Sequence, residues 1–166
     1  MLLNRKKRAF ITFALVISLT LVSLIVWQVW IKPEPALPKY IEAQLNFIAM
    51  LPKNNDVVIL EKQSFKYDKE SSVLSVVVIY KNSPITITEQ AYPDTLIYEK
   101  LIGPLKLYDE VQTKSGKAAL TRPDAARGSQ VGVINANNQI LMFAKTTKDL
   151  SNVEWQQFFN QFYPIN

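Results

Sequence analysis

Residues 73–90 read VLSVVVIYKNSPITITEQ and decide the fold class of this 166-residue chain. The first eight of these residues are almost all β-branched, aliphatic or aromatic, a composition that favours a strand. Lys81-Asn-Ser-Pro84 predicts a turn, and the positions that follow it alternate, so Ile85 and Ile87 are expected to point inward. The stretch therefore predicts an antiparallel hairpin with one buried face.

Strand-like segments flank this hairpin on both sides. They lie at 57–61, 64–67, 105–112, 118–121, 130–134 and 139–144. The short polar stretches 113–117 and 135–138 separate neighbouring segments and predict hairpin turns. We therefore expect a mainly antiparallel sheet of about six to seven strands in an α+β domain.

Two helices are expected ahead of the last strands. Apolar residues at helical spacing from Ile41 to Leu51 predict a helix over 40–51, with a compact extended segment as the alternative because prolines bracket this stretch. A second, short helix is predicted over 95–101. Asp94 is its expected N-cap, and Gly103 is expected to close it.

A third, amphipathic helix is predicted near the C-terminus. Ser151 and Glu154 have the spacing of a capping box, which marks a helix start. The apolar stripe that follows comprises Val153, Trp155, Phe158, Phe159 and Phe162. We expect this helix to lie across one face of the sheet, with Trp155 or Phe159 partly exposed to a partner as the alternative.

The N-terminal segment predicts a membrane anchor. Positions 9–31 carry no formal charge and are long enough to cross a bilayer as a helix. The tryptophans Trp27 and Trp30 near its outer end suit the headgroup layer. A cleaved signal peptide is the alternative, but no small-x-small cleavage site follows the apolar run.

The charges around this anchor predict its orientation and the division of the chain. Four cations precede the apolar run, namely Arg5, Lys6, Lys7 and Arg8. The expected organisation is a cytoplasmic stub at 1–8, the anchor at 9–31, a Pro-rich linker at 32–38 and an extracytoplasmic domain at 39–166. The predicted location is therefore the cell membrane, as a single-pass protein.

Charge and composition exclude several function classes. With the four N-terminal cations set aside, 15 basic and 14 acidic residues remain, so the outer domain is nearly neutral and no nucleic-acid partner is expected. The chain contains neither cysteine nor histidine, which removes disulfides, lipidated cysteine, the commonest metal ligand and the usual neutral-pH base. We expect no cofactor and no metal.

Candidate acid–base pairs are predicted to be solvated surface groups. Glu89 and Asp94 flank a Tyr-Pro pair, and Asp109 adjoins Glu110, but adjacent strand residues point to opposite faces. Ser115 lies among lysines in a predicted hairpin turn and has no histidine to activate it.

The loop 121–128 is the one segment with a binding signal. Its two arginines, Arg122 and Arg127, could hold an anion or contact a partner through forked hydrogen bonds. The alternative is an Arg–Asp pair that stiffens a surface connection.

The chain also resembles uncharacterised bacterial membrane-anchored ectodomains, some of which occur on anti-sigma-like proteins. The resemblance rests on 84–90 (PITITEQ), a strand turn at Gly116 and a helix opening at Leu150-Ser, and it spans about residues 50–163. Eight cytoplasmic residues are too few to hold a sigma factor, so the resemblance implies fold and location only.

These observations predict a non-enzymatic protein-interaction or assembly module of the bacterial cell envelope, with the membrane bilayer and an envelope protein as partners. The alternative is an ectodomain that binds a small ligand or a lipid. A pilin-like subunit and a hydrolase are less favoured, because no glycine precedes Gly103 and no catalytic set of residues is present. The oligomeric state is left open.

Overall fold

The computed structural model describes residues 37–53, 57–123, 128–137 and 139–165, all within one compact unit, Pro35–Asn166. The predicted anchor with its flanking cations and tryptophans, and Arg127, lie outside the described residues. No helix within the described ranges is long and apolar enough to cross a membrane.

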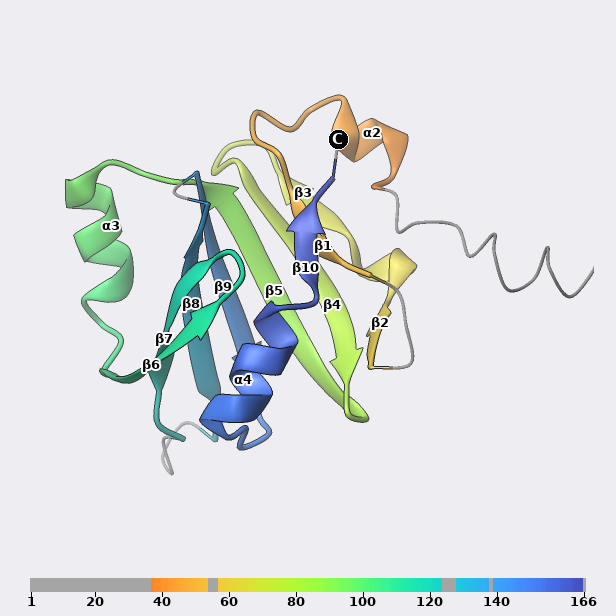
Figure 1. Cartoon of the computed structure of the whole chain (residues 1–166). Coiled ribbons are helices and arrows are strands. Elements are labelled where there is room, and N and C mark those ends of the chain that lie inside the picture. The colour runs from red at the N-terminus through yellow and green to blue at the C-terminus, as the bar shows by residue number, and fades with distance from the viewer. Residues whose placement is uncertain (1–36, 54–56, 124–127, 138, 166) are drawn as a thin grey trace, which may run out of the picture. The chain divides into compact units, whose positions relative to one another are not determined.

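The described domain is built on an antiparallel sheet of eight strands (Figure 1). Its order is β2-β4-β5-β9-β8-β7-β6, and β3 also pairs with β4. The strands are β2 (Val58–Leu60), β3 (Lys66–Asp68), β4 (Val73–Tyr80), β5 (Ser83–Ala91), β6 (Leu107–Thr113), β7 (Gly116–Thr121), β8 (Gln130–Ala136) and β9 (Ile140–Thr146). The prediction of a mainly antiparallel sheet is confirmed, with more strands than the six to seven expected.

Strands β4 and β5 form an antiparallel hairpin with one buried face, as their sequence predicts. Leu74, Val76, Val78 and Tyr80 are buried on one face of β4, and Ile85 and Ile87 continue that face on β5. The turn is two residues long, because Tyr80 pairs with Ser83. Lys81 and Asn82 both have positive φ, which fits the twist of a tight hairpin.

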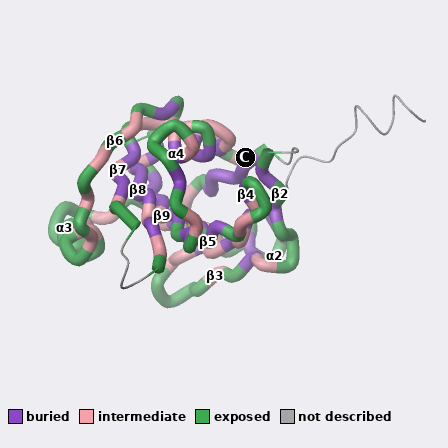
Figure 2. Tube along the Cα trace, turned by 90° about the horizontal axis from the view of Figure 1, so that it is seen from below, coloured by how far each residue is buried: buried purple, intermediate pink, exposed green. Residues whose placement is uncertain are grey.

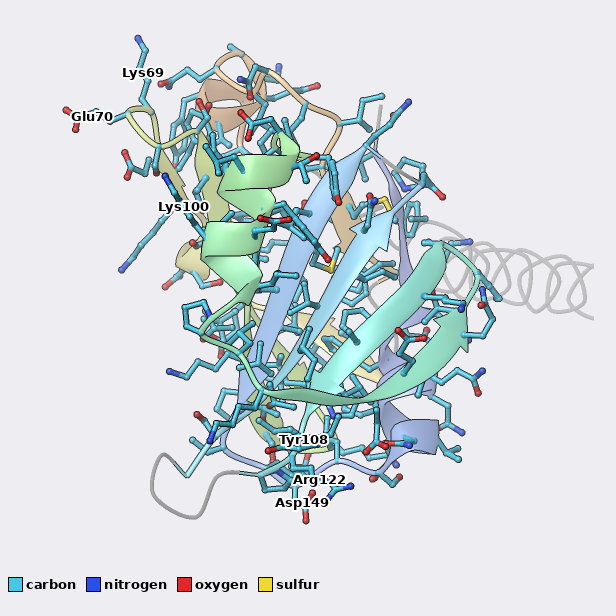
Figure 3. The ribbon with its side chains drawn as sticks, turned by 90° about the vertical axis from the view of Figure 1, so that its left-hand side faces the viewer. Lys69, Glu70, Lys100, Tyr108, Arg122 and Asp149 are labelled. Atoms are coloured by element: carbon cyan, nitrogen blue, oxygen red, sulfur yellow. The ribbon has the colours of Figure 1, made fainter. Side chains whose placement is uncertain are left out.

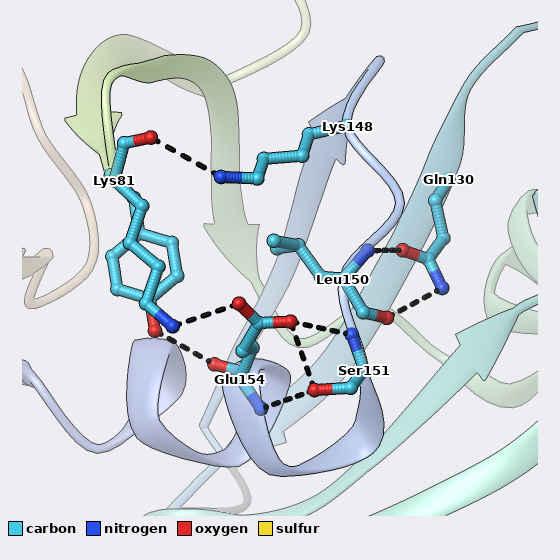
Figure 4. A network of polar contacts seen from close by, with 7 residues as sticks. Lys81, Gln130, Lys148, Leu150, Ser151 and Glu154 are labelled. Atoms are coloured by element: carbon cyan, nitrogen blue, oxygen red, sulfur yellow. Dashed lines mark hydrogen bonds and ion pairs between the residues drawn. The ribbon is translucent and has the colours of Figure 1, made fainter.

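The C-terminal helix α4 (Asn152–Phe159) packs on this buried face of the sheet. Its capping box is present: the Glu154 N–H donates to Ser151 Oγ at 3.3 Å, and the Ser151 N–H donates to the Glu154 carboxylate at 2.9 Å (Figure 4). Lys81 adds an ion pair to Glu154 at 2.8 Å. These contacts fix the start of α4 against the β4–β5 turn.

The aromatic side chains of α4 fill the core. Trp155, Phe158 and Phe159 are fully buried, so the prediction that this stripe packs on the sheet is confirmed and the alternative of a partly exposed Trp155 or Phe159 is wrong. A Cβ on Gly132 in β8 would lie 2.9 Å from the Phe159 ring, so glycine allows the helix to approach the sheet closely. Val153 faces away and is 61% exposed, because residues two apart lie about 200° from each other around a helix, so Val153 is opposite the buried Trp155.

A second, two-stranded sheet ties the two ends of the described region together. Strand β1 (Met50–Pro52) pairs antiparallel with β10 (Phe162–Pro164), which follows α4. The helix predicted over 40–51 is therefore wrong in extent: only α2 (Lys39–Glu42) is helical. The end of this segment, from Met50 onward, is extended as the alternative held, because it pairs with β10 as a strand.

Helix α4 also covers part of the free edge of β6, the last strand of the main sheet. The Gln156 side chain donates to the Gln112 carbonyl at 2.6 Å, and the Lys114 N–H donates to Asn160 Oδ1 at 2.8 Å. Side chains of the helix thus take hydrogen-bonding positions that a further strand would use.

A short 3₁₀ helix, η1 (Lys62–Ser64), joins β2 to β3, and helix α3 (Thr95–Ile102) joins β5 to β6. The predicted cap of α3 is confirmed, because Asp94 accepts the Ile97 N–H at 2.8 Å. This connection runs from the middle of the sheet to its edge over the face that α4 leaves open (Figure 1).

Candidate functional site

Helix α3 stands off the sheet instead of packing into it. It has no buried residue, and Leu96 is 63% exposed with Ile97 and Leu101 exposed beside it. Figure 2 shows this exposed trace at one end of the domain. Exposed apolar residues on a helix next to a sheet often mark a binding site, so the space between α3 and the sheet is a candidate site.

A half-open groove of about 850 Å³ lies between this connection and the sheet. Its floor comes from the outward faces of β5, β9, β8 and β7, and its roof from the end of α3 and the start of β6. The apolar part of the lining includes Val73, Leu101, Leu105, Tyr108, Val131 and Phe143. The volume falls within the range of small-ligand sites in proteins.

The groove and helix α4 lie on opposite faces of the sheet. Gly132, which meets Phe159 of α4, pairs with Ala144, and Ala144 pairs with Ile87. Residues next to these, such as Val131 and Thr88, therefore point away from α4 and into the groove.

Three cations line the groove: Lys106, Arg122 and Lys145. Of the two arginines predicted as anion contacts, Arg122 is therefore placed at the groove, and Arg127 lies outside the described residues. The Arg122 guanidinium lies 4.8 Å from the centre of the Tyr108 ring, a cation–π contact that holds it near the groove mouth. Figure 3 shows Tyr108 and Arg122 together at one end of the sheet.

Glu89 also contributes to the lining, and the prediction that it is a solvated surface group is wrong. It is 1% exposed, and its carboxylate accepts the Met50 N–H at 2.8 Å. Its other oxygen has no hydrogen-bond partner among the described residues. By strand alternation the side chain belongs to the α4 face, with Ile85 and Ile87.

Burial raises the pKa of the Glu89 carboxyl to about 8, although the hydrogen bond from Met50 acts in the opposite direction. The carboxyl is therefore mainly protonated at neutral pH and adds little negative charge to the groove. The sequence contains the signal for this burial, because Glu89 continues the inward parity of Ile85 and Ile87.

The other candidate groups do not converge. Asp109 pairs with Leu120 and Glu110 with Ala119, so the two carboxylates lie on opposite faces, as predicted. Ser115 lies in the β6–β7 turn, where its N–H donates to Thr113 Oγ1 at 3.2 Å. In the part of the chain that the structure describes, no group of acidic residues is placed to hold a metal ion.

Comparisons of this chain with protein-family models, curated proteins and solved structures find no match. The resemblance to membrane-anchored ectodomains therefore stays a prediction. Inferences about function rest on the groove and on the sequence.

Proposed function

We propose that the domain is a non-enzymatic, extracytoplasmic binding module that holds a small ligand in the groove and is anchored to the cell membrane by residues 9–31. The groove of about 850 Å³ carries this proposal. The sequence alone favours a protein partner over a ligand. We prefer a ligand because side chains fill the space under α4, whereas the opposite face of the sheet carries an open groove.

The composition of the groove supports binding more than catalysis. Its described cations have no carboxylate facing them, and the Glu89 carboxyl is engaged with Met50. An aliphatic and aromatic lining with a few polar groups is the usual pattern of a ligand site.

Obstruction of the groove floor tests the proposal. Thr88 lines the groove, whereas Ile59 is exposed on β2, two strands away from β5 and outside the lining. We expect Thr88→Phe to lose small molecules that copurify with the full chain, and Ile59→Phe to retain them, as read by native mass spectrometry. The same bound molecules in both variants would contradict the proposal.

The location is tested separately on the full chain in intact and opened cells. We expect protease to reach the domain only from the outer side, because the cations Arg5, Lys6, Lys7 and Arg8 hold the N-terminus in the cytoplasm. A mature chain that starts after Ile31, or digestion only from the cytoplasmic side, would contradict the anchor.

A second candidate is contact with another envelope protein through α3. The exposed Leu96 and Ile97 favour it, since a capped helix with no buried residue has an unoccupied apolar side. A photoreactive residue at position 96 should then crosslink one defined protein in membranes, and the same residue at Val153 on α4 should not. Equal crosslinking from both positions would count against this contact.

A further inference from the structure

Strand register gives the groove a direction. Thr88 pairs with Phe143, and Gln90 lies one step further along β5 on the same face. In the other direction along β9, Lys145 lies two residues from Phe143, a distance of about 7 Å in a strand. Lys145 pairs with Val131 of β8. The floor therefore changes along its length from uncharged to cationic.

The other two cations extend the cationic end. Leu107 pairs with Thr121, so Lys106 and Arg122 both lie just outside this pair at the same end of the β6–β7 hairpin. Arg122 rests on the Tyr108 ring and is exposed. In Figure 3 this end of the sheet lies below α3. Positive charge thus gathers at one mouth of the groove.

The uncharged part of the groove suits an aliphatic chain. Leu101 and Leu105 form its roof, Phe143 lies in its floor, and Val131 lies where the floor meets the cationic end. The floor strands β5, β9, β8 and β7 each pair with a neighbour on both sides, so their backbone groups are already hydrogen-bonded. A bound peptide would find few backbone partners here, whereas an aliphatic chain needs none.

We propose that the groove binds an amphiphile with one aliphatic chain and an anionic head group, with the head among Arg122, Lys106 and Lys145 and the chain under Leu101 and Leu105. This rests on the proposed function, because it names the ligand class of the same groove. Charge complementarity selects an anion: the three cations face no carboxylate among the described lining residues, because the Glu89 side chain belongs to the α4 face and accepts from Met50 there.

The acidic residue Asp149 lies at the same end of the sheet as Arg122 (Figure 3). It lines an adjoining space of about 220 Å³, which shares Pro123 and Ser129 with the groove, but the lining of the groove itself does not include it. Neither Arg122 nor Lys145 forms an ion pair with a described residue. In the described part of the chain their charges are unpaired, and a bound carboxylate or phosphate would pair with them.

Photolabelling of the full chain in phosphatidylcholine nanodiscs tests the ligand class. Three probes share one palmitoyl chain with a diazirine and differ in the head group, which is carboxylate, phosphocholine or trimethylammonium. We expect the carboxylate probe to label peptides that contain Leu101 and Phe143 about tenfold more than the cationic probe, since a charge-assisted bond adds this much affinity.

Charge variants identify the head site. The double variant Arg122→Gln with Lys145→Gln should reduce labelling by the carboxylate probe about tenfold. Lys69→Gln is the matched control, because Lys69 is an exposed cation in the β3–β4 turn, away from the groove (Figure 3). Thermal unfolding of each variant verifies the fold. If the double variant unfolds at a lower temperature than the unchanged protein, the comparison of the three probes on the unchanged protein still tests the anionic head group.

The outcomes separate this inference from the proposed function. Equal labelling of the groove by all three probes, unaffected by the double variant, would overturn the anionic head while leaving a groove that binds ligands. Displacement of the probe by an acidic peptide without an acyl chain, or preferential labelling by a two-chain phosphatidate, would overturn the single aliphatic chain. Failure of every probe to label the groove, or labelling unaffected by Thr88→Phe, would overturn the proposed function as well.

Discussion

The two faces of the main sheet carry helices of equal length that relate to it in opposite ways. Helix α4 buries three aromatic side chains in the core, whereas α3 buries none and leaves Leu96 and Ile97 in water. Both helices begin with a side-chain cap, so the difference does not come from how each helix starts. It follows that α4 supports the fold, whereas α3 borders the groove, to which it contributes Leu101.

Truncation of the central aromatic of α4 should have the largest effect. Trp155→Ala removes a fully buried side chain and leaves a cavity, so we expect the free energy of unfolding to fall by about 3–5 kcal/mol. Denaturant unfolding measures this loss. Val153→Ala, on the exposed side of the same helix, is the control and should change stability by less than about 0.5 kcal/mol. Equal losses would mean that α4 packs differently.

The Glu89 carboxyl, which is buried on the α4 face of the sheet, should make the stability of the domain depend on pH. Its folded pKa of about 8 exceeds the unfolded value near 4.5, so the folded state binds the proton more tightly. The contribution of Glu89 to stability should therefore be full below about pH 4.5 and fall by up to about 1.4 kcal/mol per pH unit as pH rises toward 8.

Glu89→Gln should abolish this dependence while keeping an acceptor for the Met50 N–H. Denaturant unfolding at about pH 6 and about pH 8 measures the difference. Glu110→Gln, at an exposed carboxylate on β6, is the control and should leave the slope unchanged. A wild-type stability that rises across this range would show that Glu89 is charged in the folded state.

The two helix caps should differ in their contribution to global stability. Ser151→Ala removes the cap of the core helix and should cost about 1 kcal/mol. Asp94→Ala removes the cap of α3 and should cost less than about 0.5 kcal/mol globally, because α3 can fray without opening the core. Thermal unfolding and amide exchange of both variants measure this. A larger loss for Asp94→Ala would place α3 within the core.

The smallest effect is expected on the outer side of α3. Leu96→Lys replaces an exposed apolar residue, so the free energy of unfolding should change by less than about 0.5 kcal/mol. Solubility at high protein concentration should rise, since an apolar surface patch shrinks. A clear destabilisation would show that Leu96 packs against the fold.

Much of the core could be predicted from local sequence. The alternation around Ile85 and Ile87, the capping box at Ser151 and the turn at Lys81 all act over a few residues, and the structure contains them. Glu89 was predictable by the same alternation, but its charge suggested solvent. The alternation of the strand proved the stronger constraint. Glu89 shares its face with Ile85 and Ile87, so turning Glu89 outward would have turned both isoleucines outward as well.

The groove could be anticipated only in part. Arg122 was predicted as an anion contact, but its partners Lys106 and Lys145 are distant in sequence and meet through the order of the strands. That order depends on the connection from β5 to the sheet edge, which no local pattern specifies. The failure at 40–51 has the same origin, since the β1–β10 pairing is non-local.

The side chains of Gln156 and Asn160, which hydrogen-bond to the chain at Gln112 and Lys114, have a consequence at high protein concentration. Sheets of neighbouring copies could otherwise pair edge to edge. The helix blocks such pairing at the β6 edge, so fibre-like growth would have to start at the opposite edge, formed by β2 and β3, where Ile59 is exposed. The helix that fills the core thereby also protects one edge of the sheet from pairing with another copy.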